Sequence, residues 1–124
     1  MRILIVEDDK DIGTLFSDYF KSKGHLVVLA EDGVTGFMEI WDKTFDIVIT
    51  DLNMKMKGGD SLIKGIRGFY DSDIPVIVVS GFINSDFKES IKDQEKVWLV
   101  DKPITVQKLD KLVEEICKQE GIAS

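Results

Sequence analysis

The sequence predicts an α/β fold, a doubly wound five-stranded parallel sheet with helices on both faces. Short runs rich in Val and Ile alternate along the chain with segments whose apolar residues recur at helical spacing. This alternation indicates βαβ units and a parallel sheet. Four of the runs end on charged or hydroxyl side chains, at the edge where open α/β sheets bind ligands. Right-handed crossovers between such strands require helices on both faces of the sheet.

The expected strands are the apolar runs themselves, each short and bounded by polar or turn-forming residues. Pro75 fits the start of a strand, where its missing N–H costs no ladder hydrogen bond. The five expected strands are Ile3–Val6, His25–Ala30, Phe45–Thr50, Pro75–Val79 and Val97–Val100.

The expected helices lie between and after these strands, and each carries an apolar stripe at helical spacing. The first covers residues 10–23, with Asp9 as its N-cap and Gly24 as its stop. Asp32 caps the second, the third follows the glycine-containing loop 52–59, the fourth covers 84–93, and the fifth ends the chain. The stripes are Ile12, Leu15, Phe16, Tyr19 and Phe20; Val34, Phe37, Met38 and Trp41; Leu62, Ile63, Ile66 and Phe69; Phe87 and Ile91; and Leu109, Leu112, Val113, Ile116 and Cys117.

Length and composition indicate a single domain over residues 1–124, large enough for one hydrophobic core. The formal net charge of −7 argues against nucleic-acid binding, because phosphate contacts need clustered Lys and Arg. The single cysteine excludes an internal disulfide and fits a reducing compartment. No signal-peptide pattern or apolar stretch of about 20 residues is present. We therefore expect a cytoplasmic domain without a membrane partner.

The polar groups at the strand ends have the chemistry of phosphoryl transfer. Asp51 follows a buried run, and a carboxylate there can act as a nucleophile that forms an aspartyl phosphate. Glu7 and Asp8 add the carboxylates that a Mg²⁺ ion needs. Lys102 offers a positive charge for the phosphoryl group, and Ser80 a hydroxyl that can donate to it. The order of these four strand ends along the chain is a more specific indication of this chemistry than any one of the residues.

These residues resemble the receiver domain of two-component response regulators, and the resemblance extends over essentially the whole chain. It implies a flavodoxin-like fold with strand order 2-1-3-4-5, and Gly59 stands at the glycine that opens the family's third helix. The family's acidic pair, phosphoacceptor, hydroxyl residue and Lys-Pro pair fall on Glu7 and Asp8, Asp51, Ser80, and Lys102 and Pro103.

The resemblance also implies a ligand set. Asp8 and Asp51 would ligate Mg²⁺ directly, Glu7 would act partly through water, and the backbone carbonyl of Asn53 would complete the protein ligands. Mn²⁺ is the expected substitute for Mg²⁺. The same resemblance implies a cis peptide bond before Pro103, since proline is nearly the only residue that permits one.

The chain departs from the family pattern at three positions. Lys55 replaces the usual proline four residues after the phosphoacceptor. Leu99 stands where the family has its aromatic switch residue, and strand alternation sends the neighbouring Trp98 to the opposite face of the sheet. Phe82, like Asn53, occupies a position at which the family tunes dephosphorylation. We hypothesise that this bulky ring shields the phosphoryl group from water.

The resemblance implies a phosphorylation-operated switch whose partner is a histidine kinase or a histidine phosphotransfer protein. Phosphorylation would bias the face of helix 4, strand 5 and helix 5, where a downstream protein binds. Such a domain is not an enzyme for other substrates, because it catalyses only its own phosphorylation and dephosphorylation. With no output segment after the last helix, a stand-alone receiver is expected.

Two alternative functions share parts of this pattern. A haloacid-dehalogenase-type phosphatase also uses a strand-end Asp nucleophile and Mg²⁺. It needs a second Asp two residues later as general acid/base, where this chain has Asn53. A phosphorylation-independent interaction module could use the same fold, but degenerate receivers lose the acidic pair, the Asp or the Lys. This chain keeps all of them.

Overall fold

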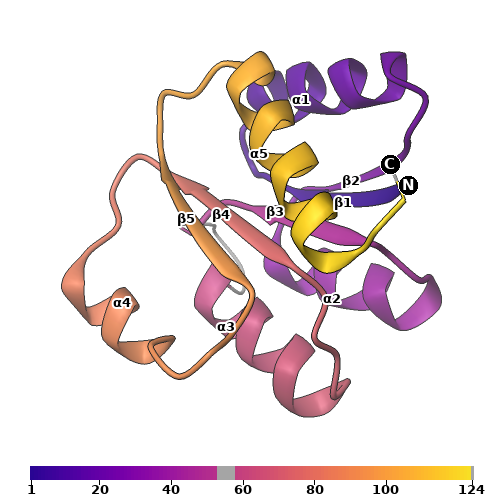
Figure 1. The fold of residues 1–124 in the computed structure, drawn as a ribbon. Helices are drawn as coiled ribbons and strands as arrows, with labels where there is room; N and C mark the ends of the chain where they lie inside the picture. Colours follow the sequence, from indigo (N-terminus) through magenta and orange to yellow (C-terminus); the bar gives the residue numbers. More distant parts are fainter. Residues whose placement is uncertain (53–57, 124) are drawn as a thin grey trace.

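A computed structural model describes residues 1–52 and 58–123, and within them strands and helices alternate along the chain (Figure 1). A π-helical turn, η1, continues the third helix. The elements are β1 (Arg2–Val6), α1 (Lys10–Ser22), β2 (Leu26–Ala30), α2 (Gly33–Asp42), β3 (Ile47–Thr50), α3 (Gly59–Lys64), η1 (Gly65–Phe69), β4 (Val76–Ser80), α4 (Ser85–Ser90), β5 (Val97–Asp101) and α5 (Val106–Glu120).

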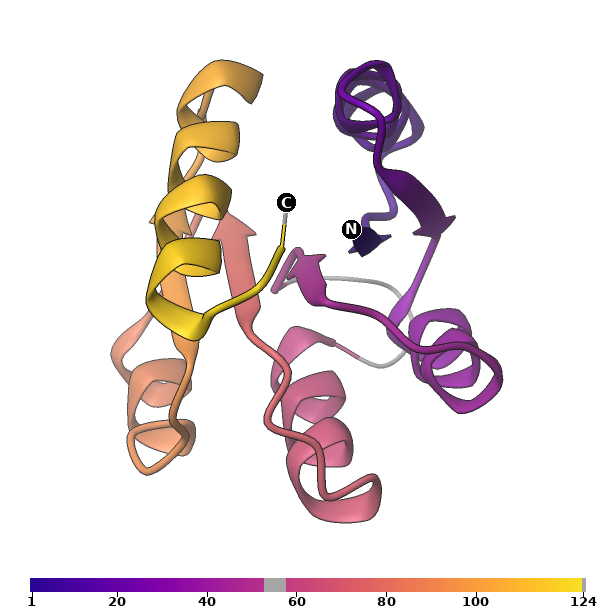
Figure 2. The same ribbon diagram turned by 45° about the vertical axis from the view of Figure 1, so that its right-hand side comes forward.

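The strands form one sheet in the order β2-β1-β3-β4-β5, and every neighbouring pair is parallel. Helices α1 and α5 cover one face, and α2, α3 and α4 cover the other (Figure 2). The predicted doubly wound sheet and its strand order are confirmed. None of the helices in the described ranges is long and apolar enough to cross a membrane.

The two faces of the sheet bury two separate cores, which explains why the strand interiors are continuous apolar runs without alternating polar residues. In β1, Ile3 and Ile5 face the α1 and α5 layer, whereas Leu4 and Val6 face the opposite layer. All four side chains are buried. Cys117 packs into the α1 and α5 core as expected, and it is buried with a pKa raised by that burial.

The predicted helix caps are confirmed. The Asp9 carboxylate accepts hydrogen bonds from the amides of Asp11 and Ile12 at 3.0 and 3.1 Å. The Asp32 carboxylate accepts one from the Thr35 amide at 2.7 Å. Each cap satisfies backbone donors that a helix leaves open at its first turn. The Asp9 cap starts α1 directly after the acidic residues that follow β1.

The expected buried stripe of the third helix is wrong at Phe69, which is 68% exposed. The cause is the π-helical turn, in which the Tyr70 amide bonds to the Gly65 carbonyl five residues earlier at 3.2 Å. This wider turn rotates the residues that follow it relative to a 3.6-residue period. Leu62 and Ile63 on α3, and Ile66 near the start of η1, are fully buried as predicted.

The stripe predicted for the second helix is also only partly buried. Met38 and Trp41 are 55% and 63% exposed, whereas Phe37 packs against the core. The Trp41 ring lies 6.1 Å from that of Phe69 and 6.0 Å from that of Tyr70. These rings therefore pack on one another at the surface instead of against the sheet.

Gly36 lets α2 approach β1 closely. A Cβ at this position would lie 2.8 Å from a methyl group of the fully buried Val6. We expect Gly36→Ala to lower the free energy of unfolding by about 1–2 kcal/mol in urea denaturation, because overpacking exceeds the gain in helix propensity. Gly68→Ala is the matched control, since a Cβ there meets nothing within 4 Å. Equal stability of the two variants would contradict this packing argument.

Candidate functional site

Backbone hydrogen bonds beyond the strand ends place the polar residues of this site. The Glu7 amide donates to the Ala30 carbonyl at 2.9 Å, which extends the pairing of β1 with β2. The Asp51 amide donates to the Val6 carbonyl at 3.0 Å. The parallel ladder thus continues one residue past these strands and holds both acidic residues at the carboxyl edge of the sheet.

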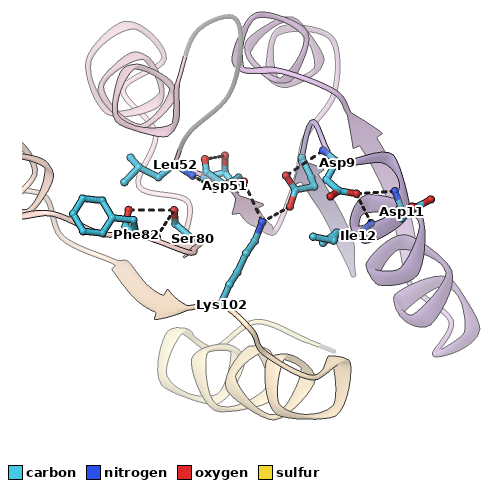
Figure 3. Close-up of polar contacts among 10 residues, drawn as sticks. Asp9, Asp11, Ile12, Asp51, Leu52, Ser80, Phe82 and Lys102 are labelled. Carbon is cyan, nitrogen blue, oxygen red and sulfur yellow. Dashed lines mark hydrogen bonds and ion pairs between the residues drawn. The ribbon is translucent and has the colours of Figure 1, made fainter.

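Lys102 reaches the same edge from β5. Its amide donates to the Ser80 carbonyl at 2.9 Å, which fixes the backbone next to β4. Its ammonium lies 2.7 Å from Glu7 Oε1 and 3.1 Å from Asp51 Oδ2 (Figure 3). One positive charge therefore bridges the carboxylates of two strands that are neighbours in the sheet.

Three carboxylates gather around this ammonium. Glu7, Asp8 and Asp51 each offer an oxygen, and these oxygens all lie within 4.8 Å of one another. Carboxylates about 4 Å apart repel by roughly 4 kcal/mol at an effective dielectric constant near 20. The Asp51 carboxylate is also oriented by the Leu52 amide, which donates to Oδ1 at 2.6 Å. The site thus concentrates negative charge that one lysine only partly neutralises.

Burial and pairing shift the pKa values of the bridging groups. Burial raises the pKa of Glu7, against the lowering effect of its hydrogen bond from Lys102. For Lys102, burial acts to lower the pKa, but the hydrogen bonds to Glu7 and Asp51 outweigh it and leave the pKa raised. The ammonium is therefore charged throughout the neutral range.

Gly59 allows α3 to begin directly against the phosphoacceptor candidate. A Cβ at residue 59 would lie 2.6 Å from the Asp51 carbonyl oxygen and 3.1 Å from the Leu52 Cα. Both are backbone atoms, so a larger residue would push the helix away from the site. Asn53 and Lys55, for which we predicted a metal-ligating carbonyl and a basic loop, lie outside the described residues.

Ser80 ends β4 and is almost completely buried. Its hydroxyl contacts the backbone of Phe82, donating to the carbonyl at 3.4 Å and accepting from the amide at 3.5 Å (Figure 3). The Phe82 ring is 67% exposed, on the loop between β4 and α4. Ser80 therefore ties the loop that carries this ring to the strand next to that of Asp51.

The structure also locates the remaining predicted positions. The peptide bond between Lys102 and Pro103 is cis, as expected. On β5, Trp98 packs half-buried against the α1 and α5 core, whereas Leu99 is exposed. The two side chains take opposite faces, which confirms the alternation argument.

Two features of the site were not predicted from the sequence. One is the direct ion pair between Glu7 and Lys102, which are 95 residues apart. The other is the Leu52 amide, whose backbone N–H carries no side-chain signal in the sequence. The sequence indicated only that Glu7 and Lys102 follow strands whose carboxyl ends share one edge of the sheet.

Comparison with known proteins identifies the family. The sequence profile of the response regulator receiver domain matches residues 3–114. The chain belongs to this family. It is therefore a receiver domain of the kind found in two-component response regulators.

Individual relatives agree with this assignment. The chain is 30% identical over 122 residues to the transcriptional regulatory protein RprY of Bacteroides fragilis, covering 96% of this chain and 50% of that protein. A Francisella receiver domain, from response regulator 1452, superimposes with a TM-score of 0.83 at 26% identity, covering 96% and 98% of the two chains. A CheY-like receiver from Methanospirillum hungatei, at 22% identity, supports the fold with a TM-score of 0.86 over 97% and 96%. The chain spans half or less of the first curated relatives it matches.

The acidic cluster fits a Mg²⁺ ion. Mg²⁺ prefers hard oxygen ligands and is commonly held by one or two carboxylates together with water. Glu7, Asp8 and Asp51 supply such oxygens around one point, with more negative charge than Lys102 balances. The donor set is therefore consistent with the ion that the family implies.

Mg²⁺ should stabilise the fold through this cluster. At a concentration ten times the dissociation constant, we expect the ion to add about 1.4 kcal/mol to the free energy of unfolding, since it binds only the folded state. Asp8→Asn should remove most of this increment in thermal denaturation with and without MgCl₂. Asp9→Asn is the control of equal charge, because Asn remains a good N-cap for α1. Loss of the Mg²⁺ effect in both variants would point to a general charge effect instead.

Proposed function

We propose that this protein is a phosphoacceptor switch in which Asp51 takes a phosphoryl group from a partner's phosphohistidine in the presence of Mg²⁺. The observation that carries the proposal is the bridging position of Lys102, whose ammonium contacts Glu7 and Asp51 at 2.7 and 3.1 Å. This contact brings a nucleophile, a metal-binding carboxylate and a phosphate-binding cation to one point. Phosphoryl transfer needs little more from a protein than such positioning and charge neutralisation.

The proposed step forms one bond and breaks one bond. An Asp51 carboxylate oxygen attacks phosphorus, and the P–N bond to the donor imidazole breaks as the O–P bond forms. The leaving imidazole nitrogen keeps the bonding electron pair and is protonated. The Leu52 amide, which donates to Asp51 Oδ1 at 2.6 Å, holds the carboxylate in one orientation during this step.

The other residues of the site receive roles by the same reasoning. Asp8 and Asp51 would hold Mg²⁺ directly, with Glu7 contributing partly through water and Asn53 through its carbonyl. The bound ion would neutralise phosphoryl oxygens during transfer. When Asp51 is phosphorylated, the Lys102 ammonium would move from the Asp51 carboxylate to the phosphoryl group, where it acts as a point charge.

Ser80 connects this chemistry to the outer surface. Its hydroxyl would donate to a phosphoryl oxygen and give up its long contacts to the Phe82 backbone. The loop that follows would then change position, and with it α4, β5 and α5, the face proposed to bind a downstream protein. Leu99 lies exposed on β5 within this face. Because Leu99 has no aromatic ring, a conformational change at this position would move an aliphatic side chain.

The alternative functions have less support. This chain lacks the general acid that a phosphatase of the haloacid-dehalogenase type needs, because residue 53 is Asn and cannot transfer the proton. A phosphorylation-independent module would not need the cluster of carboxylates or Lys102 pairing with two of them. We further propose that residues 1–124 form one receiver domain and act in the cytoplasm.

Acetyl phosphate with Mg²⁺ should phosphorylate Asp51. Intact-mass spectrometry should show one added phosphoryl group on the parent protein and none on Asp51→Asn, because the amide is not a nucleophile. Asp9→Asn, of equal charge, should label like the parent. The proposal fails if the parent stays unlabelled with both acetyl phosphate and a kinase donor. Rapid turnover of p-nitrophenyl phosphate under the same conditions would indicate a true phosphatase.

Phe82→Ala should shorten the lifetime of the phosphorylated form, because the smaller side chain gives water easier access to the phosphoryl group. We expect an acceleration of several-fold in the decay of the added mass after the donor is removed. Phe69→Ala is the matched control, because this residue is similarly exposed, 68% against 67%, but lies on η1 and not on the loop after β4. Unchanged decay in Phe82→Ala would exclude the shielding role.

A further inference from the structure

A second concave surface lies at the amino ends of β1 and β2, away from the acidic cluster. It is a cavity of about 550 Å³ in the described part of the chain. Arg2 and Leu26, which are partners in the register of β1 and β2, both line it. The five residue steps from Arg2 to Glu7 span roughly 16 Å at the usual rise of a strand. The cavity is therefore distinct from the proposed phosphorylation site.

The walls of this cavity are basic although the chain is acidic. Arg2, Lys21, His25 and Lys43 line it, and no acidic side chain does so among the described residues. The net charge of the whole chain is −7. Basic residues from the end of α1, the start of β1 and the end of α2 thus converge on one place, where they favour an anion.

Nearby carboxylates neutralise only part of this charge. Lys43 forms an ion pair with Glu39 on α2. The Asp46 carboxylate accepts a hydrogen bond from the Arg2 amide at 2.7 Å, whereas the Arg2 guanidinium donates to the Thr44 hydroxyl at 3.4 Å. Within the described residues, no carboxylate pairs with the Arg2 guanidinium or with the Lys21 ammonium. Both cations remain available to a ligand.

The floor of the cavity is apolar. Leu26 is 64% exposed on the edge strand β2, and the half-buried Val28 and Phe45 lie beside it. Because the pocket has both an apolar floor and cationic walls, it suits a molecule with both kinds of surface. Its volume lies within the range of about 300–1,000 Å³ that is usual for small-molecule sites.

We propose that this cavity binds a small anionic amphiphile, a molecule with an apolar chain or ring and a single carboxylate or phosphate head group. The apolar part lies on Leu26, Val28 and Phe45, which removes their exposed surface from water. The head group pairs with Arg2 and Lys21. The planar guanidinium matches both carboxylate and phosphate oxygens.

Decanoate, decyl phosphate and decanol, each below its micelle-forming concentration, test the proposal by ¹H–¹⁵N NMR titration of the full chain. We expect saturable shifts at the amides of Leu26, Val28 and Phe45. Either anion should bind about tenfold more tightly than decanol, because hydrogen bonds to charged groups add to the shared apolar contact. The ratio of the two anions identifies the head group. Equal binding of decanol, or shifts centred on Trp41, overturns the proposal.

Charge-reversal variants locate the head group. Lys21→Glu should weaken decanoate binding by about fivefold. Lys111→Glu, on the exposed side of α5, changes the net charge equally and should leave binding unchanged. Leu26→Asn should weaken the binding of decanoate. It should leave the weak binding of acetate unchanged, because acetate has no apolar chain to contact this residue. An equal loss of decanoate affinity in the Lys21 and Lys111 variants overturns the proposal. Tighter binding of an acidic, leucine-containing peptide than of decanoate also overturns it. Binding should persist in Asp51→Asn, so the result is independent of the phosphorylation chemistry.

Discussion

The site depends on one interaction, the contact of the Lys102 ammonium with the carboxylates of Glu7 and Asp51. Glu7 is buried, and an unpaired charge there would be costly to hold. Breaking a fully buried ion pair costs about 3–5 kcal/mol, and less here because Lys102 is partly exposed. The same contact places a cation where a phosphoryl group would need one. Stability and the proposed chemistry therefore depend on the same three side chains.

Parallel strand register makes this contact possible. Glu7 and Asp51 each follow their strand by a single position, and their amides donate to the carbonyls of Ala30 and Val6, which continues the ladder to that point. Lys102 is held in the same way by the Ser80 carbonyl. Residues almost a hundred positions apart thus meet within hydrogen-bond distance. The helices cover both faces of the sheet and leave this carboxyl edge accessible, which is where open α/β sheets bind ligands.

The protein combines a cluster of charged groups that fits the receiver pattern with an unusual surface. All the charged groups of the receiver pattern within the described residues come together, but the exposed side chain on β5 is Leu99 instead of an aromatic one. Aromatic residues are exposed elsewhere, at Phe82 beside the site and at Trp41 and Phe69 on the α2 and η1 surface. A basic cavity occupies the opposite edge of the sheet. At position 99 the chain therefore departs from the receiver pattern, whereas its cluster of charged groups keeps that pattern.

The sequence by itself determined the strands, the caps at Asp9 and Asp32 and the gathering of Glu7, Asp8, Asp51 and Lys102. These follow from local rules, in which apolar period, capping chemistry and the common direction of parallel strands act over few residues. Only the tertiary structure decided that Lys102 pairs with Glu7, that the Leu52 amide orients Asp51, and that a π-helical turn turns Phe69 outward. It also brought Arg2, Lys21 and Lys43 together around one cavity. These four features depend on packing between distant segments or on backbone groups that every sequence shares. No periodicity or motif in the sequence therefore predicts them.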